Sequence, residues 1–376
     1  MTDPAPDIRL PRDLLPADGR FGSGPSKVRP EQVAAVTDAG RRLLGTSHRQ
    51  EPVRRVVRSV RHGLAALYGL PGEWEVVIGN GGTTTFWDAA SFGLVARRSQ
   101  HLSFGEFSAK FAGVVAAAPH LDEPQVIAAE PGTCPAPEAT DGIDLYALTH
   151  NETSTGVMAP IRRPDRAGDA LVAVDATSAA GGLRVDLGEC DIYYFAPQKC
   201  LASDGGLWLA LCSPAAVARI EQLAAARWIP PSLDLSIALE NSRKDQTYNT
   251  PAIATLLMID TQLNWMLDGG GLEFAASRSE ESARVIYSWA EKRDFATPFV
   301  TDPAIRSSVV ATIDLDESID ALAVAGVLRA NGIVDTEPYR KLGRNQLRIA
   351  LYPAIDPSDV EILTRAIDHV VERTTG

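Results

Sequence analysis

Cysteine and histidine are scarce in this sequence, and neither residue type occurs in a metal-binding pattern. The 376 residues include 4 cysteines without a CxxC pair and 6 histidines without an HxH or HExxH motif. Structural zinc sites and disulfide frameworks are built on such spacings. We therefore expect neither a bound metal nor a disulfide.

Net positive charge and long apolar runs are missing too. Lysine and arginine total 36 against 48 aspartates and glutamates, a formal net charge of -12. Nucleic-acid grooves and anionic membrane surfaces need a basic face, so neither partner is predicted. The N-terminal segment alternates acids, prolines and arginines, which excludes a signal peptide or membrane anchor. We expect a cytoplasmic protein that binds any anionic substrate through a local positive cluster.

The glycine-rich run at residues 79–85, Gly-Asn-Gly-Gly-Thr-Thr-Thr, is neither a dinucleotide fingerprint nor a Walker loop. It lies between a strand-like run and a helical pattern. Small residues expose backbone N–H groups, and a helix N-terminus favours negative charge. The run predicts a phosphate cradle that includes Gly82, Thr83 and Thr84, although a simple turn with a helix cap has the same pattern.

Short apolar runs alternate with helical patterns along the chain. Buried strands are expected at Trp74–Ile78, Asp144–Leu148, Leu171–Val174, Ile192–Phe195 and Leu207–Leu211. Helices are expected from Pro30 to a cap at Gly45, from Pro52 to Tyr68, and from a first turn at Pro251 to Leu267. This alternation predicts an α/β fold with a largely parallel sheet, whose ligands bind beyond the carboxyl ends of the strands.

Three regions are expected in the chain. Residues 1–29 are predicted to form an irregular arm, residues 30–268 a large domain, and residues 269–376 a smaller α+β domain. The smaller domain is expected to contain helices at 272–293 and from 357 onward, with strands at 309–313 and 346–351.

Two polar residues follow neighbouring predicted strands. Asp175 ends the run VAVD, and Lys199 comes shortly after IYYF. A desolvated lysine can be the amine of a Schiff base, and a carboxylate can pair with a protonated pyridine nitrogen. Their spacing fits one strand-helix-strand step. A helix-capping aspartate and a solvated loop lysine are the structural alternatives.

Further candidates come from loops and charges. Phe107, expected in a loop after a strand at 101–104, could stack on a flat ring, although core packing is the default for a lone phenylalanine. Thr250, between Asn249 and Pro251, is expected at a helix N-terminus as a ligand or a plain cap. Positive charge for an anionic substrate could come from His48, Arg49, Arg340, Lys341, Arg344 and Arg348, each of which is also explained as an ordinary surface charge.

Seven motifs in order resemble the phosphoserine aminotransferases of the class-V pyridoxal 5′-phosphate (PLP) enzymes. They are FGSGPSKV, TSHRQ, GNGGTTTFW, NETSTG, VDATSAAGG, APQK and YNTPA. The likeness runs from about Phe21 to the end of the chain. It implies PLP fold type I, with a mainly parallel seven-stranded sheet in a large domain, a small C-terminal domain, and a homodimer whose active site is shared between subunits.

The resemblance also implies residue roles. Lys199 would be the catalytic PLP lysine, Asp175 the partner of the pyridine nitrogen and Phe107 the stacking aromatic. The other implied cofactor contacts are Gly82, Thr83, Thr84 and Gln198 around the phosphate, Thr153 at the ring oxygen, and Asn249 and Thr250 from the second subunit. For the substrate, His48 and Arg49 would meet phosphate or carboxylate, and Arg348 the α-carboxylate.

The chain departs from the family pattern at two places. Many members have arginine where this chain has Thr83, and a His-Arg pair where it has Tyr339-Arg340-Lys341-Leu342. Arg340, Lys341 and Arg344 are the expected substitutes in binding the substrate phosphate.

The reaction that the resemblance implies is transamination from L-glutamate to 3-phosphohydroxypyruvate, giving O-phospho-L-serine and 2-oxoglutarate. The phosphonooxy-threonine acceptor of vitamin B6 synthesis is a possible second acceptor. The alternatives are another class-V aminotransferase, such as the alanine-glyoxylate type, and a non-catalytic PLP-binding protein. A cysteine desulfurase would need a nucleophilic cysteine in the C-terminal domain, and none follows Cys212.

Overall fold

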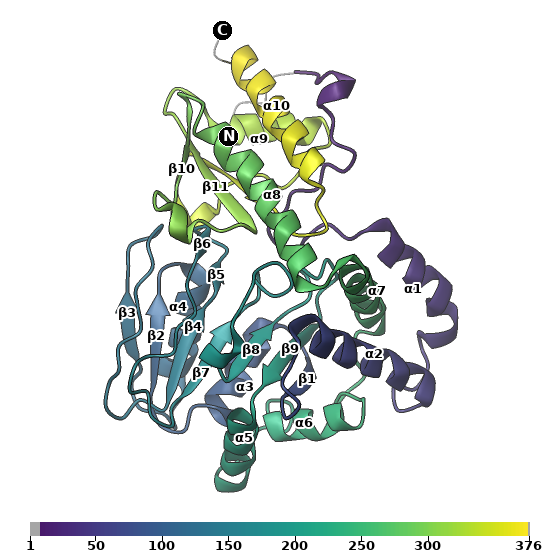
Figure 1. The fold of residues 1–376 in the computed structure, drawn as a ribbon, viewed down its shortest axis with the longest axis vertical. Coiled ribbons are helices and arrows are strands. Elements are labelled where there is room, and N and C mark those ends of the chain that lie inside the picture. The colour runs from purple at the N-terminus through teal and green to yellow at the C-terminus, as the bar shows by residue number, and fades with distance from the viewer. Residues whose placement is uncertain (1–7, 375–376) are drawn as a thin grey trace.

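A seven-stranded sheet forms the centre of the computed structural model, which describes residues 8–374 (Figure 1). The strand order is β1-β9-β8-β7-β4-β2-β3, and only β9 runs against its neighbours. The strands are β1 (Glu75–Asn80), β2 (Ser99–Ser103), β3 (Gln125–Ala128), β4 (Leu145–Thr149), β7 (Leu171–Asp175), β8 (Ile192–Phe195) and β9 (Leu207–Cys212). The predicted α/β fold with a mainly parallel sheet is confirmed.

Helices cover both faces of this sheet. Every residue of β4, β7, β8 and β9 is buried, which explains why these strands are continuous apolar runs. One face packs on α2 (Glu51–Tyr68) and α7 (Ile253–Gly269), beside α1 (Pro30–Leu43). The other face packs on α3 (Thr83–Gly93), α4 (Glu106–Ala117), α5 (Pro214–Ala226) and α6 (Leu235–Arg243).

Residues 272–374, called the C-terminal unit below, form a smaller α+β assembly at the top of Figure 1. Its antiparallel sheet has the order β10-β11-β12. Its elements are α8 (Leu272–Ala290), β10 (Ala296–Pro298), β11 (Val310–Leu315), α9 (Ala321–Ala330), β12 (Gln346–Ala350) and α10 (Pro357–Thr374). Short 3-10 turns lie at Arg12–Leu14, Leu187–Glu189, Pro303–Ile305 and Arg340–Leu342, and a small hairpin pairs β5 (Asn151–Glu152) with β6 (Val157–Met158). The expected domain limits at residues 29 and 268 stay a prediction.

The N-terminal segment packs on the C-terminal unit before it reaches the large sheet. The amide of Phe21 donates to the Val334 carbonyl at 3.2 Å, and the Phe21 carbonyl accepts from Ala350 at 2.9 Å. The side chain of Asp359 in α10 accepts from the backbone N–H of Ala17 at 2.7 Å. Residues 1–7 of the predicted arm lie outside the described residues. The segment therefore connects the C-terminal unit to the loop that follows β8.

One predicted connection is wrong. Between β7 and β8 the chain was expected to form a helix, but residues 176–191 hold turns and only the 3-10 turn Leu187–Glu189. This segment is rich in alanine and glycine, and its bends continue around the carboxyl end of β7. It thereby brings Thr177 and Ser178 to the edge of the sheet where ligands bind in parallel α/β folds.

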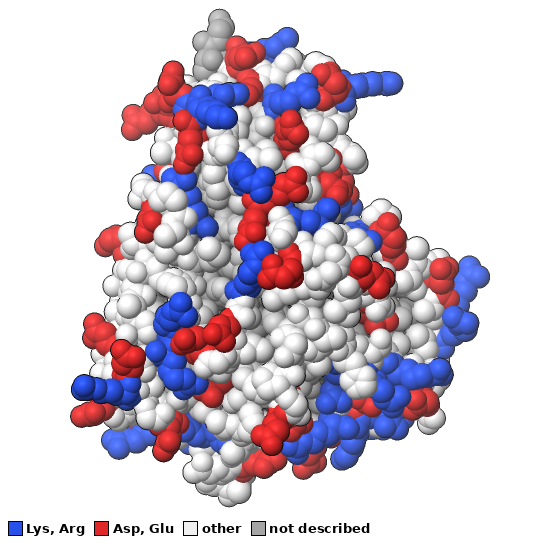
Figure 2. Space-filling view, in the orientation of Figure 1, with Lys and Arg blue, Asp and Glu red and all other residues white. Residues whose placement is uncertain are grey.

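Acidic and basic side chains are interspersed over most of the face in Figure 2, and basic side chains gather around α2 at its lower right. Helix α2 carries four arginines, Arg54, Arg55, Arg58 and Arg61, and Glu51 is its acidic residue in the first turn. The loop with His48 and Arg49 precedes this helix directly. A local positive region therefore exists on an acidic protein, as anion binding requires.

No helix within residues 8–374 is both long and apolar enough to cross a membrane.

Candidate active site

A cavity of about 200 Å³ lies beyond the carboxyl ends of β4 and β7, next to the N-terminus of α3. Its lining residues come from five separate loops or helix ends. They are Gly82, Thr83, Thr84, Trp87, Phe107, Lys110, Thr149, Asn151, Thr153, Asp175, Thr177, Ser178, Gln198 and Lys199. The structure thus brings together eight of the predicted site residues in one cavity.

Asp175 is a buried carboxylate held by two donors. Trp87 Nε1 donates to its Oδ2 at 3.1 Å, and the backbone N–H of Thr177 donates to its Oδ1 at 2.9 Å. Burial raises the pKa of Asp175 to about 6, and these hydrogen bonds oppose the rise. A carboxylate in such a position is stabilised further by a cation beside it, such as a protonated pyridine nitrogen.

The Lys199 amine forms its hydrogen bond with the N-terminal segment, and not with a carboxylate. Its Nζ donates to the Ser23 carbonyl at 2.6 Å, and the Tyr352 hydroxyl donates to the same oxygen at 2.8 Å. A Cβ on Gly24 would lie 2.0 Å from Nζ, so a side chain at this position would displace the Lys199 amine. Burial, followed by the positive charge of Arg348, lowers the pKa of Lys199 to about 8. A sizeable fraction of the amine is therefore neutral and nucleophilic near neutral pH.

The glycine-rich run forms a helix N-terminus, as its sequence predicts. Gly82 is the N-cap of α3, whose first residue is Thr83, and this cap has no side-chain hydrogen bond. The hydroxyls of Thr83 and Thr177 lie 2.7 Å apart. Gln198 Oε1 is buried without a hydrogen-bond partner among residues 8–374. Free N–H groups and hydroxyls at a helix N-terminus suit a phosphate.

Phe107 lines the cavity, but it lies in the first turn of α4 and not in the expected loop. The buried Glu152 carboxylate explains the difference, because Oε2 accepts from the backbone N–H of Phe107 at 3.0 Å and of Ser108 at 2.8 Å. A carboxylate in this position caps the helix and favours an early start. The aromatic ring is therefore fixed by the helix, which suits stacking on a flat ring.

Thr153 lines the cavity, and Arg348 of β12 contacts Thr153 from the C-terminal unit without lining the cavity itself. The Thr153 hydroxyl donates to Ser178 Oγ at 2.8 Å, and Arg348 approaches the Thr153 carbonyl at 3.4 Å. Burial lowers the pKa of Arg348, whose Nε has no hydrogen-bond partner among the described residues. A buried guanidinium with a free donor is suited to a carboxylate from a ligand.

Four predicted residues do not reach the cavity of their own chain. His48, Arg49, Asn249 and Thr250 form a separate group, in which Thr250 Oγ1 lies 3.2 Å from His48 Nδ1. Burial lowers the pKa of His48. The expectation that Thr250 caps a helix is wrong, because α7 begins at Ile253 after Ala252. The Thr250 carbonyl instead accepts from Asn80 at 2.9 Å.

The remaining basic residues lie in the C-terminal unit outside the cavity. Lys341 Nζ donates to Glu106 Oε1 at 2.5 Å, at the start of α4. Arg344 forms an ion pair with Asp314, so its charge is already partnered. Arg340 is exposed in the 3-10 turn beside Lys341.

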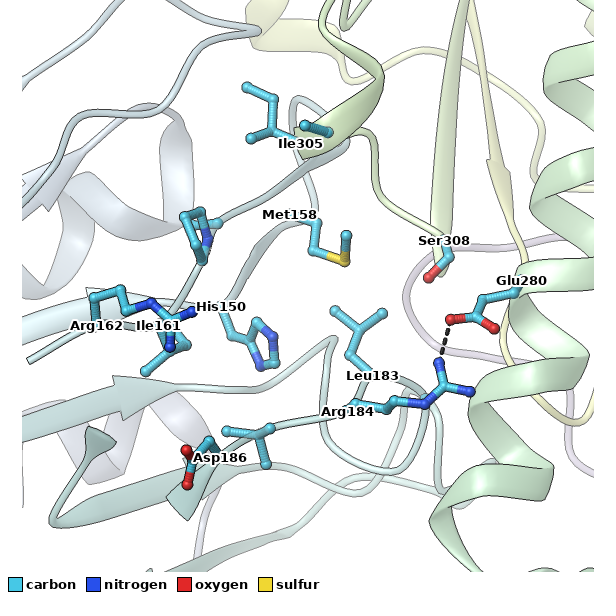
Figure 3. Close-up of a pocket in the computed structure, with 15 residues that line it drawn as sticks. His150, Met158, Ile161, Arg162, Leu183, Arg184, Asp186, Glu280, Ile305 and Ser308 are labelled. Carbon is cyan, nitrogen blue, oxygen red and sulfur yellow. Dashed lines mark hydrogen bonds and ion pairs between the residues drawn. The ribbon is translucent and has the colours of Figure 1, made fainter. Parts of the chain in front are cut away.

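A second, larger cavity lies at the junction with the C-terminal unit (Figure 3). Its volume is about 520 Å³, and Met158, Ile161, Leu183 and Ile305 contribute much of its wall. Arg184 points at Glu280 and pairs with it (Figure 3). Burial lowers the pKa of His150 in its wall to about 4, so this imidazole is neutral. The smaller cavity, where a desolvated lysine and a buried carboxylate converge, is the candidate active site.

Several functional groups of this cavity escaped the sequence analysis. They are Trp87, Lys110, Asn151, Thr177, Ser178 and the Ser23 carbonyl. Trp87 stands four residues after Thr83, so the helical repeat could have placed both on one side of α3. The others depend on contacts between distant segments, which no local pattern reveals.

Residues 120–361 match the family model described as aminotransferase class-V. The chain belongs to this family of aminotransferases. It is 60% identical over 370 residues to a putative phosphoserine aminotransferase of Mycobacterium avium, covering 98% of this chain and 99% of the relative. A phosphoserine aminotransferase of Nocardioides sp. is 61% identical over 368 residues, covering 97% and 98%. Within class V, the chain thus groups with the phosphoserine aminotransferases.

Solved structures agree on the fold. A phosphoserine aminotransferase from Cytophaga hutchinsonii superposes with a TM-score of 0.87 at 24% identity, covering 94% of this chain and 99% of that one. One from Bacillus circulans subsp. alkalophilus has a TM-score of 0.82 at 22% identity, covering 96% and 99%. The prediction of the type I fold of PLP aminotransferases is therefore confirmed.

Proposed function

We propose that this chain catalyses PLP-dependent amino transfer from L-glutamate to 3-phosphohydroxypyruvate, giving O-phospho-L-serine and 2-oxoglutarate. The observation that carries the proposal is the convergence of Lys199 and Asp175 on one cavity, with the charge of the buried Arg348 close enough to lower the pKa of Lys199. The names of the relatives from Mycobacterium avium and Nocardioides sp. support the choice of substrates.

The residues of the cavity fit PLP. Lys199 would hold the cofactor covalently through its amine, Asp175 would pair with the pyridine nitrogen, and Phe107 would cover one face of the ring. The remaining contacts would be Gly82, Thr83, Thr84 and Gln198 at the phosphate and Thr153 at the ring oxygen. Gln198 Oε1 is buried without a partner among residues 8–374, and a half-turn of this amide would present its Nε2 donor to the phosphate in place of the oxygen.

When bound, PLP supplies an electron sink for the negative charge that forms at the substrate Cα. Arg348 binds the α-carboxylate and thereby orients the Cα–H bond. The free amine of Lys199 would be placed to move the proton at Cα, because its pKa of about 8 leaves a neutral fraction at working pH.

The proposal includes a cytoplasmic homodimer in which each site is completed by the other subunit. The group of His48, Arg49, Asn249 and Thr250 does not reach the cavity of its own chain, and it lies beside a basic surface around α2. In a two-fold dimer, the same group would approach the neighbouring cavity. There it would add positive charge for a substrate that carries phosphate and carboxylate.

A visible spectrum of the purified protein tests the reaction. The absorption band of the bound cofactor, near ~410 nm for PLP on lysine, should bleach with L-glutamate and return with 3-phosphohydroxypyruvate. Recovery with glyoxylate alone would assign the chain to another class-V aminotransferase. A protein that binds PLP without bleaching would be a non-catalytic carrier. Recovery with the four-carbon 2-oxo acid that corresponds to phosphonooxy-threonine, added as the acceptor, would extend the function to vitamin B6 synthesis.

A further inference from the structure

Lys110 contributes an ammonium group to the wall of the candidate active site. It lies one turn after Phe107 in α4 and lines the same cavity. Its Nζ stands 4.9 Å from the centre of the Phe107 ring, a cation–π distance. The ring that is expected to cover the cofactor therefore also supports an ammonium group.

Lys341, in the C-terminal unit, provides a second ammonium group that contacts the start of α4. Glu106 Oε1 accepts from Lys341 Nζ at 2.5 Å and lies 3.5 Å from Lys110 Nζ. These ion pairs hold the pKa of Glu106 below its usual value, so the carboxylate is charged at neutral pH. The three residues together carry one net positive charge, and the side chains of Lys110 and Lys341 are 43% and 68% exposed.

An aromatic pair separates these two lysines from the buried guanidinium. Phe107 and Tyr339 have ring centres 6.0 Å apart, and Arg348 lies 5.2 Å from the Tyr339 ring. The buried Arg348 thus lies against one ring of this pair and Lys110 against the other, and Lys341 is joined to Lys110 through Glu106. A ligand with two anionic groups joined by a short carbon chain matches this arrangement.

We propose that Lys110 and Lys341 together bind the phosphate group of the substrate, and that Glu106 is the counter-ion which the phosphate displaces. The proposal rests on the proposed function and deepens it, because it assigns the contacts that select a phosphorylated acceptor. The Glu106 carboxylate is partly buried and carries one charge, whereas a phosphate dianion offers two charges and several acceptor oxygens to the two lysines. Exchange of partners is therefore favourable.

The test compares Lys110→Met, Lys110→Arg and the control Lys292→Met, which makes the same change at an exposed turn after α8. The first readout is the dissociation constant of inorganic phosphate for the PLP-loaded protein, from the perturbation of its absorption band. The second is kcat/KM with 3-phosphohydroxypyruvate divided by that with hydroxypyruvate. Lys110→Met should weaken phosphate binding and lower this ratio by about 10- to 100-fold, while Lys110→Arg and Lys292→Met keep both within about threefold.

Glu106→Gln separates ligand binding from a structural role. If Glu106 competes with the substrate, its neutral variant binds inorganic phosphate more tightly. If the three residues only fasten the Lys341 loop to α4, both Glu106→Gln and Lys110→Met lower turnover with either acceptor and leave the ratio unchanged. That result overturns the proposal. The proposed function fails separately, if the wild-type protein does not use 3-phosphohydroxypyruvate at all.

Discussion

The indole of Trp87 donates a hydrogen bond of 3.1 Å to the buried carboxylate of Asp175. Trp87 belongs to α3 and Asp175 ends β7, so the bond ties the helix of the phosphate cradle to the strand that carries the acid. It is one of two donors that offset the cost of burying this carboxylate. The two ends of the proposed cofactor are therefore held in a fixed relation.

Replacing Trp87 with phenylalanine should weaken cofactor binding. The loss of one charge-assisted hydrogen bond raises the pKa of Asp175 beyond about 6 and costs about tenfold in the dissociation constant of PLP. Titration of the cofactor-free protein with PLP measures this constant. Trp228→Phe is the control, since Trp228 is 77% exposed. Equal affinities in both variants would show that the bond does not support the carboxylate.

The amine of Lys199 should titrate near pH 8 in the cofactor-free protein. Its pKa is lowered from 10.5 by burial and then by Arg348, so the neutral form appears as the pH rises through about 8. The rate of PLP uptake should therefore increase up to this pH and then level off. Arg348→Gln removes the like charge and should move the midpoint to higher pH, whereas the exposed Arg97→Gln should not. A wild-type midpoint near 10.5 would contradict the desolvation of Lys199.

Gly24→Ala should disturb Lys199 without unfolding the protein. The added Cβ would lie 2.0 Å from Nζ, so the amine must leave the Ser23 carbonyl. We expect slower PLP uptake by about tenfold or more and a shifted midpoint of the pH profile. Gly72→Ala is the matched control, because nothing lies within 4 Å of its Cβ. An unchanged rate of PLP uptake in Gly24→Ala would mean that the N-terminal segment shifts away from Lys199 at little cost in free energy.

Asp359→Ala should destabilise the attachment of the N-terminal segment. The buried carboxylate accepts from Ala17 at 2.7 Å and from Asp18 at 3.3 Å, and its loss leaves these backbone donors unpaired. The free energy of unfolding in urea should fall by about 1–3 kcal/mol. Asp141→Ala, at an exposed turn, should change it little. Equal stability of the two variants would contradict this role.

Mixed dimers can test whether Arg49 acts across the subunit interface. Arg49→Ala should raise KM for the phosphorylated acceptor more than it lowers kcat, and Lys199→Ala should abolish turnover. If the two residues serve one site from different subunits, a hybrid dimer keeps one intact site. If the two variants are mixed in equal amounts and exchange subunits at random, about half of the dimers are hybrids. About a quarter of all sites are then intact. No recovery in a confirmed hybrid would place both residues in the same subunit's site.

Much of the architecture could be predicted because its signals are local. Apolar runs such as Leu171–Val174 and Ile192–Phe195 identify buried strands, and the rule that ligands bind beyond their carboxyl ends brings Asp175 and Lys199 together. Pro30 and Gly69 mark helix ends for steric reasons that operate within a few residues. The limits of these helices agree with expectation within one or two residues.

The rest could not be predicted because it depends on distant partners. Glu152 caps α4 from another segment, so Phe107 is helical where its neighbours suggest a loop. The Thr250 side chain contacts His48 instead of capping a helix, and α7 begins at Ile253. Lys110 lines the cavity because it lies on α4, one turn after Phe107. Propensity and periodicity carry no information on such contacts.

The carbonyl that receives the Lys199 amine belongs to Ser23, and the hydroxyl that shares it belongs to Tyr352, 329 residues later in the chain. During synthesis on a ribosome, domains fold from the N-terminus as they emerge. Here Phe21 and Ser23 can pack only after their partners near Ala350 and Tyr352 have been made. The large sheet can form earlier, but the Ser23 carbonyl is not fixed beside Lys199 until Tyr352 has been made. A chain that ends before Tyr352 should therefore form most of the large sheet without holding the Lys199 amine in place.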